Sequence, residues 1–170
     1  MRYAHYGITI LDLFCSRFDR VFSMGEVHFL FWRIYQGAKQ DDPQTFCSCG
    51  KSFESCDVYG DVLKGMSRMA NIDIFNNPRN YDFSIVRNIV RGKDIIGKRI
   101  LRKILKISLS SRHLFFLRYI PYFLLLKTIK RNWDLFDSVA KKTESKYVVD
   151  SSKSYLRYLL LKMYRPNNIK

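Results

Sequence analysis

The stretch from Tyr147 to Leu161, YVVDSSKSYLRYLLL, places an aspartate, three serines and a lysine between a strand-like apolar run and a leucine-rich run. Amides at a helix start, hydroxyl donors and an ammonium group together suit the binding of an anion. The alternative is a helix cap, in which Asp150 or one of the two serines after it accepts from first-turn amides while the lysine is solvated. The candidate ligand-binding residues of this junction are Asp150, Ser151, Ser152, Lys153 and Ser154.

A second candidate lies near the amino terminus, where HYGITILD places a histidine, a glycine and a threonine directly before a predicted helix. Gly7 would let the backbone approach a phosphate closely, Thr9 would donate a hydroxyl, and His5 could donate to an oxyanion. The pattern is not a nucleotide-triphosphate loop of the GxxxxGK[ST] type, because no lysine follows the glycine. These three residues are therefore candidates for contact with an anionic ligand of another kind.

Glu26 follows a glycine at the end of a predicted strand, in VFSMGE. A carboxylate in this place could act as a general base. The alternative is a helix N-terminal carboxylate that interacts with the helix dipole. Ligands of parallel sheets bind beyond the carboxyl ends of the strands, so the junctions Ser23–Glu26 and Asp150–Ser154 could face one site.

Three cysteines occur close together in FCSCGKSFESC, at Cys47, Cys49 and Cys56. A zinc site usually has four ligands in paired knuckles or with added histidines, and only distant residues could supply the fourth. A disulfide is not expected in a reducing cytosol. We therefore expect buried thiols or a locally ordered loop, and no bound metal. The distant ligand candidates are Cys15, His28 and His113.

The elements that would position these residues alternate between helices and short apolar strands. Apolar residues at helical spacing predict helices, and short β-branched runs bounded by glycine predict strands. The strand over 146–150 is expected to be buried. An aromatic helix or loop is expected to end near Gly37. The expected helices cover about residues 8–17, 58–69, 85–109, 123–142 and 155–163, and the expected strands cover 21–23 and 146–150.

This alternation predicts an α/β fold with a parallel sheet flanked by helices. The chain of 170 residues with 47% hydrophobic content is long enough for a sizeable core. We expect one domain over residues 1–170, with a cysteine-containing loop near residues 39–57. Pro166 is expected to end the last helix.

Positive charge is concentrated in the second half of the chain, whose net charge as a whole is +15. Residues 1–90 hold 10 Lys and Arg against 10 Asp and Glu, whereas residues 91–170 hold 20 against 5. Such a surface attracts nucleic acid, an anionic membrane, or a phosphorylated or sulfated small molecule. Early charges exclude a signal peptide, so we expect a cytoplasmic protein. The aromatic and basic segment LFFLRYIPYFLLL predicts a core helix and leaves peripheral membrane contact as the alternative.

In their order along the chain, HYGITILD, VFSMGEVHFL, FCSCGKSFESC and YVVDSSKSYLRYLLL resemble the bacterial sulfotransferase family. That family transfers the sulfuryl group of 3′-phosphoadenosine 5′-phosphosulfate (PAPS), and the resemblance extends over nearly the whole chain. It implies a P-loop NTPase-like α/β fold, here incomplete and helix-rich, whose first strand-loop-helix binds the 5′-phosphosulfate. It also implies a hydroxyl acceptor on a carbohydrate, a lipid or a small metabolite, with PAPS as the donor and no metal.

Sulfuryl transfer, like phosphoryl transfer, requires an in-line attack and stabilisation of the developing negative charge. The resemblance therefore implies a base and electrophilic groups beside the phosphosulfate. The residues it implies to be catalytic are Glu26, Lys153 and His5. The residues it implies to bind the donor are Gly7, Thr9, Ser151, Ser152 and Ser154.

The chain also departs from the family pattern. Tyr6 and Ile8 stand where the family has hydroxyl residues, and Phe18-Asp19 stands in place of a His-Pro pair. The family strand that precedes the phosphosulfate loop, and the one that holds the 3′-phosphate, would lie beyond the two ends, so we expect a fragment or degenerate copy truncated at both ends. The alternative is a non-catalytic basic module for an anionic membrane surface or, less favoured because no RNA-binding signature is present, nucleic acid.

Overall fold

The computed structural model describes residues 12–15, 17–37, 47, 49–78, 81, 83, 103, 107 and 119–169. These residues form a helix-rich structure with a small parallel sheet, which agrees with the predicted α/β class at this coarse level. The elements are β1 (Val21–Ser23), the 3-10 helix η1 (Val27–Phe29), α2 (Leu30–Gly37), α3 (Tyr59–Ala70), α6 (Tyr119–Thr143), β2 (Tyr147–Val149) and α7 (Tyr155–Tyr164).

The chain divides into two compact units. The first is drawn from residues 1–83 and 132–153 and holds both strands, η1, α2, α3 and the end of α6. The second is drawn from residues 84–131 and 154–170 and holds the start of α6 and α7. A single domain over residues 1–170 stays a prediction.

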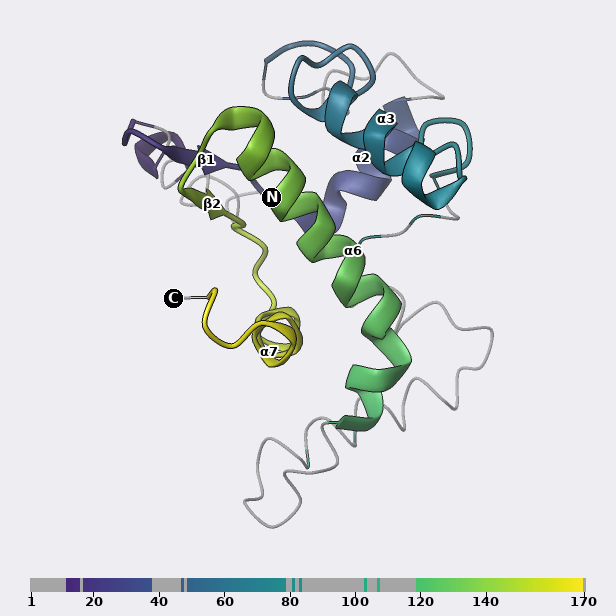
Figure 1. Cartoon of the computed structure of the whole chain (residues 1–170), viewed down its shortest axis with the longest axis vertical. Helices are drawn as coiled ribbons and strands as arrows, with labels where there is room; N and C mark the ends of the chain where they lie inside the picture. The colour runs from purple at the N-terminus through teal and green to yellow at the C-terminus, as the bar shows by residue number, and fades with distance from the viewer. Residues whose placement is uncertain are drawn as a thin grey trace, which may run out of the picture. The chain divides into compact units, whose positions relative to one another are not determined.

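The two predicted strands are confirmed, and they pair with each other in parallel (Figure 1). Phe22 lies opposite Val148, and the ladder continues past the strand end, where Met24 N–H donates to the Val149 carbonyl at 2.9 Å. Valine, phenylalanine and tyrosine suit this extended backbone because their bulky side chains pack well on a pleated surface. The predicted burial of residues 146–150 is wrong, since Tyr147 is 46% exposed.

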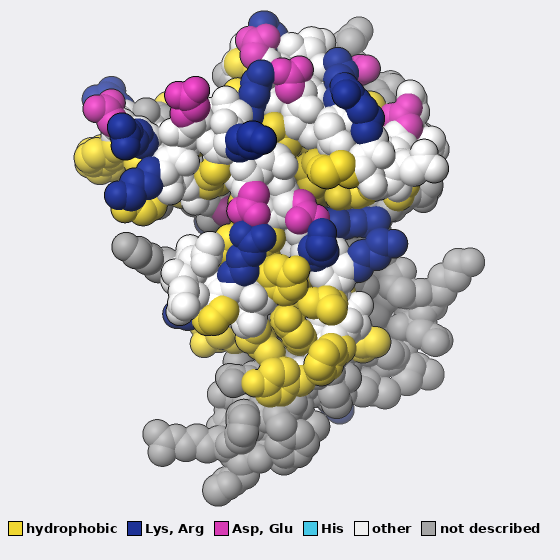
Figure 2. Space-filling view, in the orientation of Figure 1, with side chains coloured by type: hydrophobic (Ala, Val, Ile, Leu, Met, Phe, Trp, Pro, Cys, Tyr) yellow, Lys and Arg dark blue, Asp and Glu magenta, His cyan; other side chains and the backbone are white. Residues whose placement is uncertain are grey.

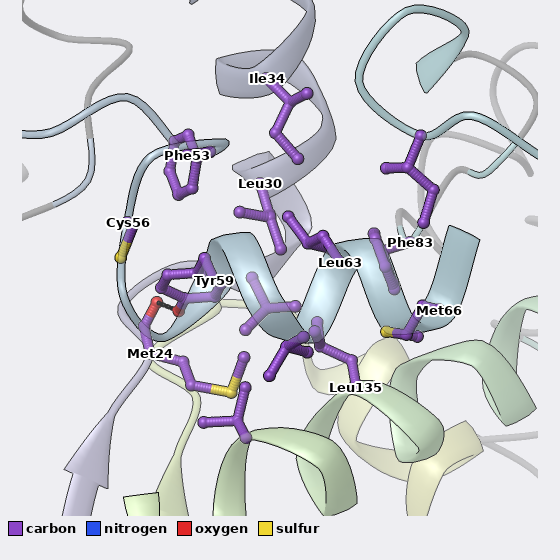
Figure 3. Close-up of a cluster of buried hydrophobic side chains, with 14 of the residues drawn as sticks. Met24, Leu30, Ile34, Phe53, Cys56, Tyr59, Leu63, Met66, Phe83 and Leu135 are labelled. Atoms are coloured by element: carbon purple, nitrogen blue, oxygen red, sulfur yellow. Dashed lines mark hydrogen bonds between the residues drawn. The ribbon is translucent and has the colours of Figure 1, made fainter. Parts of the chain in front are cut away.

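The core of the first unit lies around α3, as Figure 3 shows. Tyr59, Val62, Leu63 and Met66 recur at helical spacing and are all buried, so one face of the helix packs inward. The helix ends at Asn71, whose left-handed backbone (φ 51°) lets its N–H reach the carbonyls of the last turn. The predicted helix over 58–69 is therefore confirmed. The other core side chains include Met24, Val27, Leu30, Ile34, Phe53, Phe83, Leu135 and Val139.

Helix α6 begins four residues before the predicted start at Phe123, so it takes in Pro121. Proline is tolerated there because the N–H groups of the first turn have no partner within the helix. In the part of α6 that belongs to the first unit, Leu135 and Val139 are fully buried, and Asn132 Nδ2 donates to the Phe83 carbonyl at 2.9 Å. This bond ties the helix to the chain segment that follows α3.

The remaining predicted elements fall partly within the described residues. Asp12–Cys15 are helical, as predicted for residues 8–17, but Arg17 already lies in a turn, so the predicted end is too late. The predicted aromatic segment is helical as α2 and ends at Gly37. Of the predicted helix over 85–109, Lys103 and Ile107 are described, and both are helical. The predicted end of the last helix is confirmed, because α7 stops at Tyr164, two residues before Pro166.

Candidate functional site

The carboxyl ends of β1 and β2 lie side by side, because the two strands run in parallel and in register. The contact continues beyond the strands, where Ser151 N–H donates to the Gly25 carbonyl at 3.0 Å. Gly25 adopts a left-handed backbone (φ 63°) that other residues rarely take, and so turns the chain away from the strand. Within the first unit, the backbones of Ser23–Glu26 and Asp150–Lys153 therefore meet, as the prediction for these two strand ends requires, whereas Ser154 belongs to the second unit. We call this place the strand-end junction.

Asp150 holds the strand-end junction together through one carboxylate oxygen. Its Oδ1 accepts from Val27 N–H at 3.3 Å, from Ser152 N–H at 3.0 Å and from the Ser152 hydroxyl at 2.6 Å. The carboxylate therefore lies at the start of η1, 123 residues away in sequence. A carboxylate is favourable there because helix starts present amide donors and a positive dipole. Asp150 thus satisfies a helix start, but of η1 and not of the helix that follows it.

Asp12 is a member of the strand-end junction that the sequence did not single out. Its Oδ1 accepts from the Ser23 hydroxyl at 2.7 Å, and its Oδ2 accepts from the Ser151 hydroxyl at 3.0 Å. One carboxylate therefore bridges the two strand ends. The signal that could have pointed to it is a lone charge within the apolar run ITILDLF. A partly buried carboxylate needs polar partners, and Asp12 has them in the two serine hydroxyls.

Ser154 belongs to the second unit and acts as the N-cap of α7. Its hydroxyl accepts from Arg157 N–H at 3.2 Å, while its carbonyl accepts from Tyr158 N–H at 3.0 Å. The cap alternative for DSSKS is therefore correct in kind, although Ser154 and not an earlier residue performs it. The Ser154 hydroxyl already serves this helix.

Glu26 and Lys153, the predicted base and electrophilic group, both lie in the described strand-end junction. Glu26 is half-buried and immediately precedes η1, where its carbonyl accepts from Phe29 N–H at 3.0 Å and its side chain makes no capping bond. Lys153 is exposed. The remaining predicted residues, His5, Gly7 and Thr9, lie outside the described residues.

Two carboxylates, those of Asp12 and Asp150, lie beside Ser151 and Ser152 in the strand-end junction. The carboxylates of Asp12 and Asp150 receive the hydroxyl protons of Ser151 and Ser152, because an ionised carboxylate can only accept. These two hydroxyls therefore do not point protons at an anionic ligand in this conformation. An anion at the junction would depend on Lys153, whereas a hydroxyl acceptor would find carboxylates able to take its proton.

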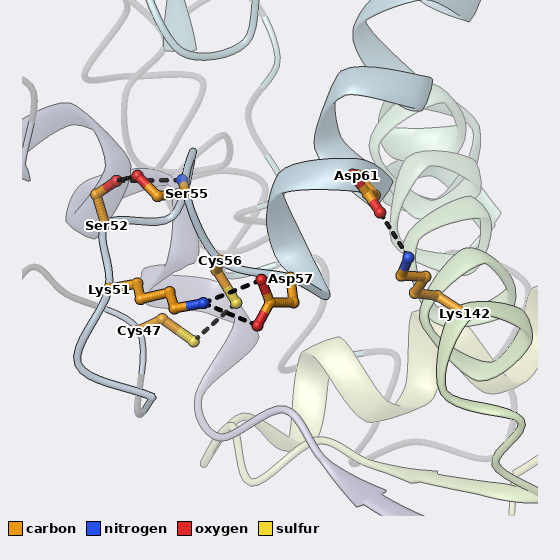
Figure 4. A network of polar contacts seen from close by, with 8 residues as sticks. All are labelled: Cys47, Lys51, Ser52, Ser55, Cys56, Asp57, Asp61 and Lys142. Carbon is orange, nitrogen blue, oxygen red and sulfur yellow. Dashed lines mark hydrogen bonds and ion pairs between the residues drawn. The ribbon is translucent and has the colours of Figure 1, made fainter.

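The three cysteines are brought together next to the core of the first unit. Cys47 and Cys56 are buried, Cys49 is exposed, and Cys56 Sγ lies 3.4 Å from Cys47 Sγ (Figure 4). Burial raises the pKa of the Cys47 thiol to about 12. The pKa of Cys49 is lowered, chiefly by the backbone amide of Lys51. The expectation of buried thiols is therefore met by two of the three.

Comparisons of this chain with protein-family models, with curated proteins and with solved structures give no match.

Proposed function

We propose that this chain is a sulfotransferase-like domain that takes a sulfuryl group from PAPS and passes it to a hydroxyl acceptor, in a P-loop NTPase-like setting. The observation that supports the proposal is the strand-end junction, where a parallel pair brings Glu26 and Lys153 to the same edge of the sheet. In parallel sheets this edge is where ligands bind. A base and a cation there are the groups that sulfuryl transfer requires.

In the proposed reaction, the acceptor oxygen attacks the sulfur of PAPS while the bond from sulfur to the bridging phosphate oxygen breaks. Glu26 takes the proton of the acceptor hydroxyl, and Lys153 stabilises the negative charge that develops on the leaving phosphate oxygen. The products are a sulfate ester and 3′-phosphoadenosine 5′-phosphate. Asp12 and Asp150 position the junction by holding Ser151 and Val27. The loop with His5, Gly7 and Thr9 would hold the phosphosulfate.

Calorimetric titration with 3′-phosphoadenosine 5′-phosphate tests the donor site, with AMP as the ligand control. At about 0.15 M salt, exposed charges more than about 8 Å apart are largely screened, so weak general attraction contributes little. We expect saturable binding that prefers the 3′-phosphorylated nucleotide. If a folded sample does not bind 3′-phosphoadenosine 5′-phosphate, the proposed function is wrong.

A matched pair of lysines separates a local role from a loss of charge. Lys153 follows β2, whereas Lys146 precedes it at the opposite end and lies over the ring of Tyr147 at 5.5 Å. Lys153→Ala is expected to weaken nucleotide binding about tenfold or more, as expected when a hydrogen bond to a charged group is lost. Lys146→Ala removes the same charge and should leave binding nearly unchanged. An equal loss of nucleotide affinity in both variants would show that binding depends only on the net charge of the chain.

The role of Glu26 is tested separately from binding. Glu26→Gln keeps the size of the side chain and removes its basicity. We expect the variant to bind 3′-phosphoadenosine 5′-phosphate as the parent chain does and to transfer sulfate to a panel of hydroxyl acceptors more slowly, by about a hundredfold. Unchanged transfer would assign the base to another group.

A second function is favoured by one feature of the second unit. In α6, the side chains of Tyr119, Phe123 and Leu124 are exposed, the last two by 66% and 70%, close in sequence to the exposed Lys127 and Lys130. Figure 2 draws one face of the molecule on which hydrophobic side chains of described residues gather. Aromatic and leucine side chains beside lysines suit the surface of an anionic membrane. No helix among the described residues is long and apolar enough to cross a membrane.

Vesicle flotation tests this second function. We expect the chain to float with vesicles that contain phosphatidylserine and to lose this association in Leu124→Glu. Met69→Glu is the control, since Met69 is an exposed apolar residue of α3 in the other unit. Equal binding to neutral phosphatidylcholine vesicles, or no binding to either, would count against a membrane role.

A further inference from the structure

The three cysteine sulfurs form a cluster that no step of sulfuryl transfer uses. The Sγ atoms of Cys47, Cys49 and Cys56 all lie within 4.8 Å of one another, and no fourth His, Cys, Asp or Glu joins them among the described residues. Two of the residues are buried beside the core, and the third is exposed. A disulfide joins only two sulfurs, so it would not account for the third sulfur of this cluster.

The backbone around the first two cysteines forms a tight turn. Gly50 N–H donates to the Cys47 carbonyl at 2.9 Å, and Cys47 N–H donates to the Lys51 carbonyl at 2.9 Å. Gly50 adopts a left-handed backbone (φ 79°), which reverses the chain between the two bonds. The turn places Cys47 and Cys49 on one side, where Cys56 meets them.

The same turn points backbone amides at the sulfurs. The backbone amide of Cys49 acts to lower the pKa of the Cys47 thiol, although burial outweighs it, and the backbone amide of Lys51 is the chief cause that lowers the pKa of Cys49. Hydrogen bonds from the surroundings to ligating atoms orient them and offset their charge, and they are a regular part of metal sites. Nearby, the Lys51 ammonium pairs with the Asp57 carboxylate at 2.9 Å, as Figure 4 shows.

The spacing of the sulfurs fits a thiophilic ion. A zinc–sulfur bond of about 2.3 Å in a tetrahedral site separates the sulfurs by about 3.8 Å. Here the sulfurs of Cys47 and Cys56 lie 3.4 Å apart, and no two of the three sulfurs are more than 4.8 Å apart. Small rotations of the side chains would therefore bring all three sulfurs to ligand distance.

We propose that Cys47, Cys49 and Cys56 bind one Zn²⁺ ion as three thiolate ligands, with water in the fourth position. On binding, the thiols release their protons to the solvent and form three zinc–sulfur bonds, with no change of oxidation state. The ion closes the segment from Cys47 to Cys56 against the start of α3. The site is separate from the proposed sulfuryl transfer.

The test uses the full chain, purified under reducing conditions and freed of metal, and titrated first with Co²⁺. Tetrahedral cobalt bound by thiolates gives visible ligand-field bands and a near-ultraviolet sulfur-to-cobalt charge-transfer band. We expect both bands to saturate at one ion per chain and to disappear when Zn²⁺ displaces Co²⁺. Absence of the bands in a chain whose circular dichroism shows it to be folded would overturn the proposal.

A matched pair of serine variants locates the site. Cys49 is exposed, so Cys49→Ser should leave the fold intact while removing one ligand, and the affinity for Zn²⁺ is expected to fall about tenfold or more. Cys15 lies outside the cluster, and Cys15→Ser should keep the parent affinity. Equal affinity of Cys49→Ser and the parent chain would overturn the proposal. The proposal would also be overturned if the reduced chain binds no metal and forms a disulfide between Cys47 and Cys56 on mild oxidation.

Discussion

Alanine at Gly60 and alanine at Gly65 should change the stability of the chain in opposite directions, although both glycines lie in α3. A Cβ atom added at Gly60 would collide with the carbonyl oxygen of Glu54 and lie 3.2 Å from its carbonyl carbon. These are backbone atoms, which cannot swing aside as the end of a side chain can. A Cβ atom added at Gly65 would meet nothing within 4 Å.

The size of each effect follows from these contacts. Forcing an extra methyl group into a well-packed place costs roughly 1–3 kcal/mol. Alanine is also the better helix former, by about 1 kcal/mol in a helix interior and less near a helix start such as Gly60. We therefore expect Gly60→Ala to lower the free energy of unfolding by roughly 1–2 kcal/mol. Gly65→Ala should raise the free energy of unfolding by about 1 kcal/mol.

Urea unfolding followed by circular dichroism measures both variants under the same conditions. A change of midpoint at constant slope reports a change of stability, whereas a change of slope reports a change in the exposed surface. Gly60→Ala is expected to unfold at lower urea than the parent chain and Gly65→Ala at higher urea. If Gly60→Ala is as stable as the parent, the carbonyl of Glu54 does not pack against the start of α3 as the structure has it.

Three further predictions concern the core, a helix cap and an ion pair. Leu63 is fully buried, so Leu63→Ala should lower the free energy of unfolding by about 2–5 kcal/mol, whereas Met69→Ala, at an exposed position of the same helix, should change it by less than about 0.5 kcal/mol. Ser154→Ala removes the cap of α7 and should cost about 1 kcal/mol in chemical denaturation, while Ser154→Gly should cost only a few tenths. The Lys142 ammonium lowers the pKa of the Asp61 carboxyl from 3.8, so the ion pair stabilises the folded chain above that pH and its contribution is lost as the pH falls through the lowered value. Urea midpoints of Lys142→Met and the parent should therefore differ at neutral pH and converge as the pH falls through the lowered pKa of Asp61. A difference that persists in acid would assign the effect of Lys142 to packing.

The helices and strands were largely predictable, because the spacing of apolar residues within each short segment indicates its secondary structure. The burial of Leu63 and Met66 follows from their spacing in α3, and the strand at Val21–Ser23 follows from an apolar run that ends at a glycine. The burial of β2 was not predictable in the same way. It depends on what covers the strand, and a run such as YVV is equally compatible with a half-exposed position.

The parts of the site that could not be predicted are contacts between distant segments. The sequence identified Asp150 as a possible cap, yet its partner is Val27, on another element. Asp12 reaches Ser151 across 139 residues, and no local pattern encodes such a contact. The residue that caps α7 is Ser154 and not one of the three residues predicted. The position of a cap depends on where the helix begins, and the boundaries of elements are what a sequence predicts least reliably.

The start of α3 connects the cysteine cluster with the strand-end junction inside the first unit. Gly60 N–H donates to the Cys56 carbonyl at 2.7 Å, and the hydroxyl of Tyr59, its neighbour, donates to the Met24 carbonyl at 3.2 Å. Burial raises the pKa of Tyr59, so this hydroxyl keeps its proton and remains a donor. An ion that fixes Cys56 therefore also steadies the backbone that precedes Glu26. The two proposals remain separable, because the cobalt spectrum reports on the cysteines alone. A chain that binds the ion but not the nucleotide would retain the zinc site and lose the sulfotransferase function.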